Sequence, residues 1–387
     1  MTHIVIISTA DWDHPIWTNK QHVACSLANQ GHTILYVESL GLRGANNSGK
    51  DLSRIFRRLI KGLSPPKRVR QNIWVLSPLV IPGASNSIVL TINRYILNIS
   101  IKLSLYFSQM SREWLWTYNP MTLKYIDLGK FYKSIYHAVD AIHEQPGMPK
   151  KLIKEEERKL CREVDHVFAT SPQIKKELEP FSNNIKYESN CCDYEHFSRA
   201  LTIDGENIPN DLLVIPKPII GFIGAISNYK LDFDLIKSVA IQAKNWNFVF
   251  IGPTCEGEKD TDISMLKSMP NIHFLGYRKY KYLPNYCAGF DVGWLPLRFN
   301  KYTQSMFPMK FFEYLAAGLP VVASSIDSLN EFRKEAALCN SSAKCFLDAI
   351  NLSLSDKSLT LKDRLELAKL HTYEKRTLRM VQKIINR

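Results

Sequence analysis

The sequence has none of the short patterns that hold a structural metal or a disulfide framework. Its eight cysteines include no CxxC pair and no His/Cys spacing suited to zinc, so we expect reduced and mostly buried thiols. A low-complexity tract and a short-period repeat are also absent. With 45% hydrophobic and 22% charged residues, the composition excludes a disordered or fibrous chain and is typical of a globular enzyme.

Long apolar runs are absent as well. The nearest one, residues 88–110, is interrupted by Asn93, Arg94, Asn98 and Lys102, so we expect a buried or surface helix there rather than a membrane span. The first residues lack the charged region, long apolar core and cleavage site of a signal peptide. We therefore expect a soluble protein that faces the cytoplasm.

The length of 387 residues favours two domains of about 150–200 residues each. Apolar runs of strand length alternate with segments of helical spacing, first from residue 4 and again from residue 219, which is typical of parallel, doubly wound α/β sheets. The stretch 204–218, rich in Pro and Asn, is the expected boundary. The prediction is an N-terminal Rossmann-like domain over 1–205, a C-terminal one over 206–370, and a helix over 371–387 that packs back across the domains.

The segment between residues 300 and 318 has the side chains best suited to bind a phosphorylated ligand. Ser305 is predicted to cap a helix whose first turn contains Pro308 and which ends at Gly318. The N–H groups and hydroxyls at such a helix start bind phosphate readily. Lys310 and Glu313 share one helix face, where the lysine can hold a phosphate and the glutamate can accept hydrogen bonds from ribose. The alternative is a solvated Lys–Glu pair on an amphipathic helix.

An ordered series of motifs resembles the nucleotide-sugar-binding domain of GT-B glycosyltransferases, in their glycogen-synthase-like, retaining superfamily. The motifs are Ile219–Leu235, Gly252-Pro253, Asn271–Tyr277, Leu283-Pro284, Phe290–Val292, Pro308, Lys310, Glu313–Gly318 and Pro320–Val322. Two more, Asp11-Trp12 and Tyr136–Asp140, resemble a bacterial branch that works on surface polysaccharides, similar to teichuronic-acid-type glycosyltransferases. Asn190–Phe197 resembles the family's stretch near the interdomain linker. The resemblance extends across almost the whole chain. It implies a GT-B fold, in which two Rossmann-like doubly wound domains face each other across a cleft.

The resemblance also implies how the second domain binds its donor. Glu313 matches the family's ribose-binding glutamate, whereas Ser305 stands where the family has a companion glutamate that contacts the sugar. The loop 303–307 matches the position that cradles the diphosphate, and Tyr277 and Arg278 follow the strand where relatives hold the base. The donor-binding residues implied in this way are Tyr277, Arg278, Thr303, Ser305, Met306, Phe307, Lys310 and Glu313.

Two further residues are implied in catalysis. Many relatives place Arg and Lys in the turn after the first strand of the second domain; here the Arg position is Ala225, and Lys230 is the remaining basic residue, expected to stabilise the leaving diphosphate. Asp140 lies where the first domain approaches the reacting sugar in similar proteins; the alternative is a capping or structural aspartate. Preorganised donors and a cation relieve the negative charge that develops on the leaving phosphate. No metal ion and no cofactor is therefore expected.

Basic residues are concentrated near the start of the chain, within a net charge of +13. Apolar residues between 52 and 63 recur at helical spacing, and Arg54, Arg57, Arg58 and Lys61 occupy the other side. A cationic amphipathic helix is typical of an anionic membrane surface. The alternative is a domain helix packed on the sheet with a solvated basic face. No recognition motif accompanies the charge, so nucleic-acid binding is not expected.

These patterns together predict a glycosyltransferase that moves a sugar from a UDP- or GDP-linked donor to a glycan or lipid-linked acceptor in surface polysaccharide synthesis. By resemblance, the reaction retains the anomeric configuration and needs no metal. The expected location is the cytoplasm, peripheral on the inner face of the cell membrane. The alternatives are a nucleotide-sugar epimerase or hydrolase of the same fold, and a non-catalytic scaffold that docks on membranes.

Overall fold

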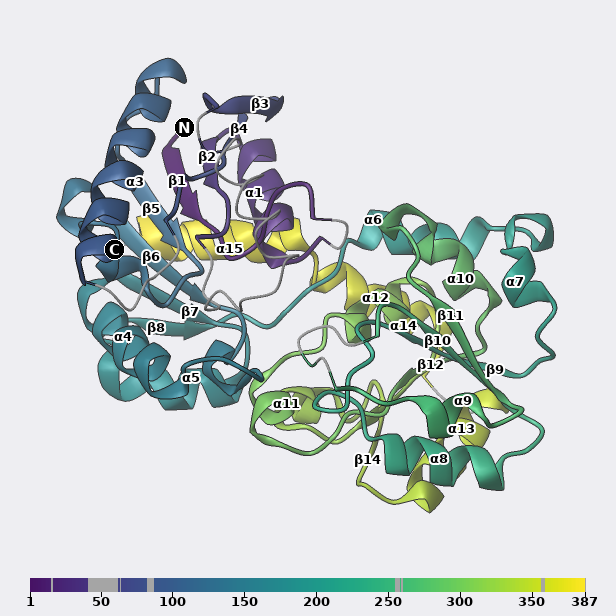
Figure 1. Cartoon of the computed structure of the whole chain (residues 1–387). Helices are drawn as coiled ribbons and strands as arrows, with labels where there is room; N and C mark the ends of the chain where they lie inside the picture. The colour runs from purple at the N-terminus through teal and green to yellow at the C-terminus, as the bar shows by residue number, and fades with distance from the viewer. Residues whose placement is uncertain are drawn as a thin grey trace. The chain divides into compact units, whose positions relative to one another are not determined.

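The computed structural model describes residues 1–14, 17–40, 62, 64–81, 87–254, 258, 260–355 and 359–386. The chain divides into two compact units, each built around its own sheet (Figure 1). The first unit comprises Met1–Thr170, Ile174–Glu188 and Thr377–Arg387, and the second comprises Ser171–Gln173 and Ser189–Arg376.

The first unit contains an eight-stranded sheet in the order β3-β4-β2-β1-β5-β6-β7-β8. Its strands are β1 His3–Ile7, β2 Thr33–Val37, β3 Lys67–Arg70, β4 Ile73–Leu76, β5 Trp114–Thr117, β6 Lys133–Ala138, β7 His166–Ala169 and β8 Ile185–Tyr187. All neighbours pair in parallel except β3 and β4, which are antiparallel. Residues 4–7 of β1 are completely buried, as in a parallel sheet covered on both faces.

Helices connect these strands in the manner of a doubly wound sheet. The main ones are α1 Asn19–Asn29, α3 Ser87–Phe107, α4 Lys150–Glu163 and α5 Pro172–Leu178. One core cluster joins Leu97 and Ile101 of α3 to Leu35 of β2 and Ile153 of α4, so α3 and α4 pack into the same layer of the unit. The predicted α/β architecture of this half is therefore present.

The second unit contains a six-stranded parallel sheet in the order β11-β10-β9-β12-β13-β14. Its strands are β9 Ile219–Ile223, β10 Asn247–Ile251, β11 Ile272–Gly276, β12 Val292–Leu295, β13 Val321–Ser324 and β14 Ala337–Cys339. Its helices are α6 Tyr194–Phe197, α7 Asn210–Leu213, α8 Phe233–Gln242, α9 Ser264–Lys267, α10 Leu283–Gly289, α11 Lys301–Ser305, α12 Lys310–Ala316, α13 Ala343–Leu354 and α14 Leu361–Leu370. One large apolar core holds sheet and helices together.

The two units divide between Glu188 and Ser189, whereas the sequence favoured a boundary at residues 205 and 206. The segment in between contains Cys192, Phe197 and Ala200, which are buried in the core of the second unit. These apolar side chains assign the segment to the second unit. The Pro- and Asn-rich stretch that suggested the later boundary lies within that unit.

The C-terminal helix α15, Tyr373–Ile385, has residues in both units. In its first turn, the guanidinium of Arg376 donates a hydrogen bond to the carbonyl of Ser189 (3.4 Å). Further along, Arg379 and Lys383 both form ion pairs with Glu188, at 3.1 and 2.5 Å. Polar contacts within each unit therefore hold the two ends of this helix.

Candidate functional site

The topology of the second sheet locates a ligand site at its carboxyl edge. The chain runs from β9 outward through β10 and β11, then returns to β12 on the other side of β9 and continues through β13 and β14. Such a reversal opens a crevice beyond the carboxyl ends of the two central strands, where open parallel sheets bind their ligands. The loops that follow β9 and β12 therefore form the centre of the candidate site.

These two loops are joined by hydrogen bonds, which fix the surroundings of Lys230. The backbone N–H of Arg298 donates to the carbonyl of Lys230 (2.9 Å), and the side-chain amide of Asn300 donates to the carbonyl of Tyr229 (2.7 Å). The Lys230 ammonium lies 5.4 Å from the centre of the Tyr229 ring and is half-buried. Among the described residues no carboxylate forms an ion pair with it. The predicted leaving-group cation thus sits at the topological reversal, in a fixed loop.

The helix predicted from Ser305 to Gly318 begins only at Lys310, and Ser305 ends a separate helix, so the expectation that Ser305 caps it is wrong. α11 ends at Ser305, and α12 begins at Lys310. Pro308 lies between the two helices. It interrupts the helical backbone, because the residue before a proline avoids helical angles and the proline has no N–H to donate. The Ser305 hydroxyl instead donates to the carbonyl of Lys301 within α11 (2.8 Å).

Buried hydroxyls on α11 serve the backbone. Thr303 is completely buried, and its hydroxyl donates to the carbonyl of Arg298, while its N–H donates to the side chain of Asn300 (3.0 Å). Ser305 is also buried. The two hydroxyls that the sequence offered to a diphosphate are thus engaged in local structure, and the backbone of the following turn remains as the group that can approach a ligand.

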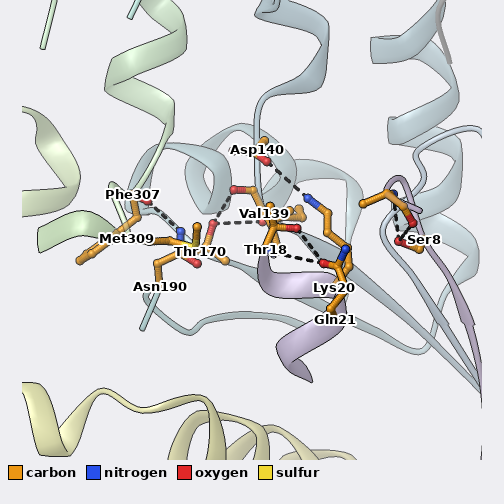
Figure 2. Close-up of polar contacts among 12 residues, drawn as sticks. Ser8, Thr18, Lys20, Gln21, Val139, Asp140, Thr170, Asn190, Phe307 and Met309 are labelled. Atoms are coloured by element: carbon orange, nitrogen blue, oxygen red, sulfur yellow. Dashed lines mark hydrogen bonds and ion pairs between the residues drawn. The ribbon is translucent and has the colours of Figure 1, made fainter. Parts of the chain in front are cut away.

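Hydrogen bonds to three consecutive backbone carbonyls hold that turn in place. The carbonyl of Ser305 accepts a hydrogen bond from the hydroxyl of Ser171 (2.7 Å), and that of Met306 accepts one from Ser328 (2.7 Å). The carbonyl of Phe307 accepts one from the side-chain amide of Asn190 (2.7 Å; Figure 2). Each contact fixes a peptide plane, so the turn is rigid before any ligand arrives. Preorganisation of this kind is what tight binding and catalysis require of a site.

The aromatic ring of Phe307 packs into the core of the second unit and so holds the turn on that core. It is buried and stacks on Phe312 with ring centres 5.3 Å apart and planes 9° apart. Phe312 in turn stacks on His371, 4.3 Å away, next to the start of α15. Phe307 therefore supports the turn through packing, and its side chain belongs to the core.

Lys310 and Glu313 form a buried ion pair in the first turn of α12. Their side chains are 20% and 5% exposed, and the ammonium is bonded directly to the carboxylate. Lys310 also lies 5.4 Å from the centre of the buried Phe197 ring. The alternative of a solvated pair is wrong, because the apolar surroundings exclude water from the carboxylate. Burying two charges is costly, and such a pair at the carboxyl edge of an α/β sheet is a strong functional candidate.

The negative charge of Glu313 affects its neighbours. Burial raises the pKa of Tyr280 well above its usual range, and the Glu313 carboxylate raises it further. Tyr280 stacks on His196 with ring centres 4.3 Å apart, and its carbonyl bonds to the His196 ring (2.9 Å). Burial lowers the pKa of His196, which keeps this ring neutral beside the ion pair.

A cavity of about 390 Å³ opens at the carboxyl ends of β9, β10 and β11. It is lined by Ile226, Gly252, Pro253, Thr254, Ile263, Lys267, Phe274, Gly276 and Tyr277. Its size is in the range of small-ligand sites, and its walls are mainly apolar or backbone. The sequence-predicted Tyr277 lies in this wall and is 38% exposed, a position from which an aromatic ring can stack on a planar ligand.

Arg278, predicted to bind the donor with Tyr277, is engaged elsewhere. Its guanidinium donates to the carboxylate of Asp211 (2.5 Å) and to the hydroxyl of Tyr286 (2.6 Å). The hydrogen bond that Arg278 donates to Asp211 raises the pKa of Arg278 above its usual value. It does not line the cavity, so the structure gives Arg278 a role in linking α7 to α10.

In the first unit, Asp140 follows β6 and lies next to a lysine that sequence reasoning missed. The Lys20 ammonium is 3.8 Å from the Asp140 carboxylate (Figure 2). It is 5.9 Å from the centre of the Tyr118 ring. Lys20 is only 8% exposed, and burial lowers its pKa, while the charge of Asp140 opposes that shift. Its place in the first turn of α1, beyond the carboxyl end of β1, was the signal that could have identified it.

The predicted membrane-surface residues Arg54, Arg57, Arg58 and Lys61 lie outside the described residues.

Comparisons with known proteins agree with this geometry. Residues 217–356 match the family described as "Glycosyl transferases group 1". The chain has the fold of the GT-B glycosyltransferases. The matched group 1 domain covers all six strands of the second sheet together with α11 and α12.

A sequence relative and two solved structures place the chain more closely. It is 30% identical over 196 residues to a Bacillus subtilis (strain 168) protein described as a teichuronic acid biosynthesis glycosyltransferase, TuaH. That match spans 48% of this chain and 46% of the relative. Sucrose-phosphate synthase from Thermosynechococcus elongatus superposes with a TM-score of 0.70 at 16% identity, covering 99% of this chain and 98% of that one. Anabaena HepE, in complex with UDP-glucose, gives a TM-score of 0.68 at 13% identity over 100% of both chains.

These matches confirm the predicted GT-B fold class and the resemblance to a surface-polysaccharide branch of glycosyltransferases. At these identities the solved structures establish the fold, and the residues of this chain carry the argument about chemistry.

Proposed function

We propose that this chain transfers a glycosyl group from a nucleoside diphosphate sugar, linked to UDP or GDP, to a hydroxyl of a glycan or lipid-linked acceptor in surface polysaccharide synthesis. The observation that carries the proposal is the buried Lys310–Glu313 pair beside the fixed turn 305–309, at the carboxyl edge of the group 1 domain. HepE, a structural neighbour, was solved with UDP-glucose bound, which favours UDP.

Donor binding would exchange the partners of this ion pair. The Lys310 ammonium would turn to the diphosphate, and the Glu313 carboxylate would accept hydrogen bonds from the two ribose hydroxyls. Both groups would thereby keep a charged or hydrogen-bonding partner in a site from which water is excluded. The base would enter the cavity beside Tyr277, which lies at the same edge of the sheet.

In the reaction, the bond between the anomeric carbon and the diphosphate oxygen breaks, and negative charge grows on the leaving nucleotide. The Lys310 and Lys230 cations, and the backbone N–H groups of the turn at Phe307 and at the start of α12, are the groups proposed to stabilise that charge. We propose that no metal is needed and that the anomeric configuration is retained. Asp140 is proposed to approach the reacting sugar, with Lys20 as the residue that positions it.

The residue at position 305 is a serine, so no carboxylate is available there to bind the sugar of the donor. It occupies the position of the family's companion glutamate, and its hydroxyl is buried against its own helix. A carboxylate is thus absent at that point of the chain. We propose that the backbone of the turn 306–309 holds the sugar instead, which would give less discrimination between sugars than a charged side chain.

The test is a turnover assay with the purified chain and separate UDP- and GDP-sugars, with and without a polyprenyl-linked saccharide acceptor. The proposal expects a glycosylated acceptor and free nucleotide only when both substrates are present. Conversion of the donor alone into an epimer or into free sugar would favour an epimerase or hydrolase. Absence of nucleotide binding and of turnover would favour a non-catalytic scaffold that docks on membranes.

A lipid-linked acceptor gives the protein a place of action. We propose that it works in the cytoplasm, peripherally on the inner face of the cell membrane, where such acceptors expose their saccharides.

A further inference from the structure

Helix α3 exposes an apolar face that the described residues of the first unit leave uncovered. Large side chains exposed on this helix are Ile88, Ile92, Tyr95, Ile99, Leu103, Tyr106 and Phe107. Their exposed fractions range from 39% for Ile99 to 79% for Tyr106. The middle five recur at spacings of three and four residues, so they lie in one stripe about 80° wide.

The opposite face of α3 holds the helix on its domain. Leu97, Ile101 and Leu105 are buried in the core cluster of the first unit. Asn93 adds two hydrogen bonds to the backbone of Ile81, at 2.7 and 2.9 Å. In the described part of the chain, residues 88–107 form a helix long and apolar enough to cross a bilayer. Crossing would remove three core side chains from the sheet, so this helix is suited to lie along a membrane.

The sequence segment that contains α3 is strongly basic. Between Leu52 and Arg112 the sequence has ten basic residues and no Asp or Glu. Those in the described part are Lys67, Arg68, Arg70, Arg94, Lys102 and Arg112. Arg94 and Lys102 lie on α3 itself and are exposed. Lys102 borders the apolar row, and α3 has no Asp or Glu, so this face complements an anionic surface that covers an apolar layer.

We infer that the α3 face, defined as Ile92, Tyr95, Ile99, Leu103 and Tyr106, docks on an anionic lipid bilayer with the helix axis along the membrane plane. The aliphatic side chains enter the acyl boundary, and the two tyrosines lie at the headgroup level, where their amphipathic rings are favoured. Lys102, at the edge of this face, meets lipid phosphates. A bilayer has phosphates at its surface and acyl chains beneath them, so it can contact the basic and the apolar side chains of this face at the same time. The reason for such docking, to reach a lipid-linked acceptor, rests on the proposed function. The inference that the α3 face binds a bilayer does not depend on it.

The experiment measures sedimentation of the full chain with vesicles of phosphatidylcholine alone or mixed with phosphatidylglycerol. We expect binding to the anionic vesicles. The triple variant Ile92→Gln, Ile99→Gln and Leu103→Gln should weaken it by at least about tenfold, because three exposed aliphatic groups no longer enter the membrane. The variant Lys102→Gln should lower binding to anionic vesicles by about fivefold and leave binding to neutral vesicles unchanged.

A matched control removes three equally exposed aliphatic residues from the second unit: Ile241→Gln, Leu352→Gln and Leu370→Gln. This control should bind vesicles as the unchanged chain does. Wild-type binding by the α3 triple variant would overturn the inference. A dimer that the triple variant dissociates, with vesicle binding unaltered, would also overturn it in favour of a contact between copies.

The outcome is separable from the proposed transfer activity. Glu313→Gln should bind vesicles normally and lose nucleotide affinity, whereas the α3 triple variant should keep nucleotide affinity and a normal melting temperature. A negative result in the nucleotide assay therefore does not affect the conclusion on membrane binding. A negative result in the vesicle assay likewise does not affect the conclusion on transfer activity.

Discussion

The Lys310–Glu313 pair allows stability and donor binding to be separated by substitution. Glu313→Gln leaves the Lys310 ammonium in apolar surroundings without its partner. Removing one member of a buried ion pair typically costs about 3–5 kcal/mol in the free energy of unfolding. Because the Lys310 side chain is 20% exposed, water can reach part of the ammonium, and we expect about 2–3 kcal/mol.

The double variant Lys310→Met with Glu313→Gln should recover most of that loss, since it removes both charges while keeping similar volumes. Its affinity for UDP should nevertheless fall by about a hundredfold or more. Each hydrogen bond to a charged group contributes about 1.5–3 kcal/mol, and the double variant loses those to the diphosphate and to the ribose. Recovered stability with lost affinity is the signature of a pair maintained for ligand binding.

The assay combines urea unfolding with isothermal titration of UDP for the wild type, both single variants and the double variant. The exposed pair Lys362–Glu366, 3.9 Å apart on α14, is the control; Glu366→Gln should change stability by no more than about 0.5 kcal/mol. If the double variant binds UDP like the wild type, the pair is purely structural and the reasoning is refuted.

Three other substitutions test single features of the structure. Lys20→Met should be more stable than the wild type near neutral pH, and its advantage should shrink as the pH rises from the lowered pKa of Lys20 towards the ordinary value, measured by urea unfolding. Gly252→Ala should lose roughly 2–3 kcal/mol of stability, because a Cβ there would lie 1.9 Å from a backbone oxygen at a φ of +148°, whereas Gly205→Ala, with open space around it, should melt normally. Arg278→Gln should cost about 1 kcal/mol through its lost contact with Asp211 and leave UDP affinity unchanged.

The sign of the Lys20 prediction follows from linkage. Its pKa is lower in the folded chain, so the unfolded chain binds more protons between the two values and stability rises with pH in that window. Below the window the full cost of the buried charge is present. A gap between Lys20→Met and the wild type that widens with pH would contradict burial as the cause. For the other two substitutions, unchanged melting of Gly252→Ala or weakened UDP binding by Arg278→Gln would contradict the structure.

Much of the strand framework could be predicted from the sequence. Runs such as residues 4–7, 33–37 and 219–223 are apolar throughout, because parallel strands are buried on both faces, and the structure has strands there. Strand β3 was missed because Lys67–Arg70 is an edge strand with mostly exposed, basic side chains and has no apolar signal.

The candidate site was only partly predictable. Helical spacing placed Lys310 and Glu313 on one face, and the structure pairs them. Spacing could not show that the pair is buried, because the apolar partner Phe197 lies more than a hundred residues away in the sequence. Likewise, the position of Lys20 just after the first strand could mark it as a candidate, but its pairing with Asp140 depends on the sheet order that brings α1 and the end of β6 together.

The break between α11 and α12 follows from the tendency of proline to interrupt a helix, which the sequence-based prediction underestimated. The sequence predicts Pro308 in the first turn of a helix, whereas in the structure it lies between two helices. This separation creates the turn whose three carbonyls are fixed by Ser171, Ser328 and Asn190. The functional turn thus depends on contacts from distant segments, which a single-sequence pattern does not contain.

The most direct measurement is a crystal structure of the chain with UDP. The account predicts that the Lys310–Glu313 contact opens, with the ammonium of Lys310 within hydrogen-bonding distance of the diphosphate and the carboxylate of Glu313 bonded to the ribose hydroxyls. UDP bound elsewhere on the chain, with the ion pair intact and buried, would contradict it.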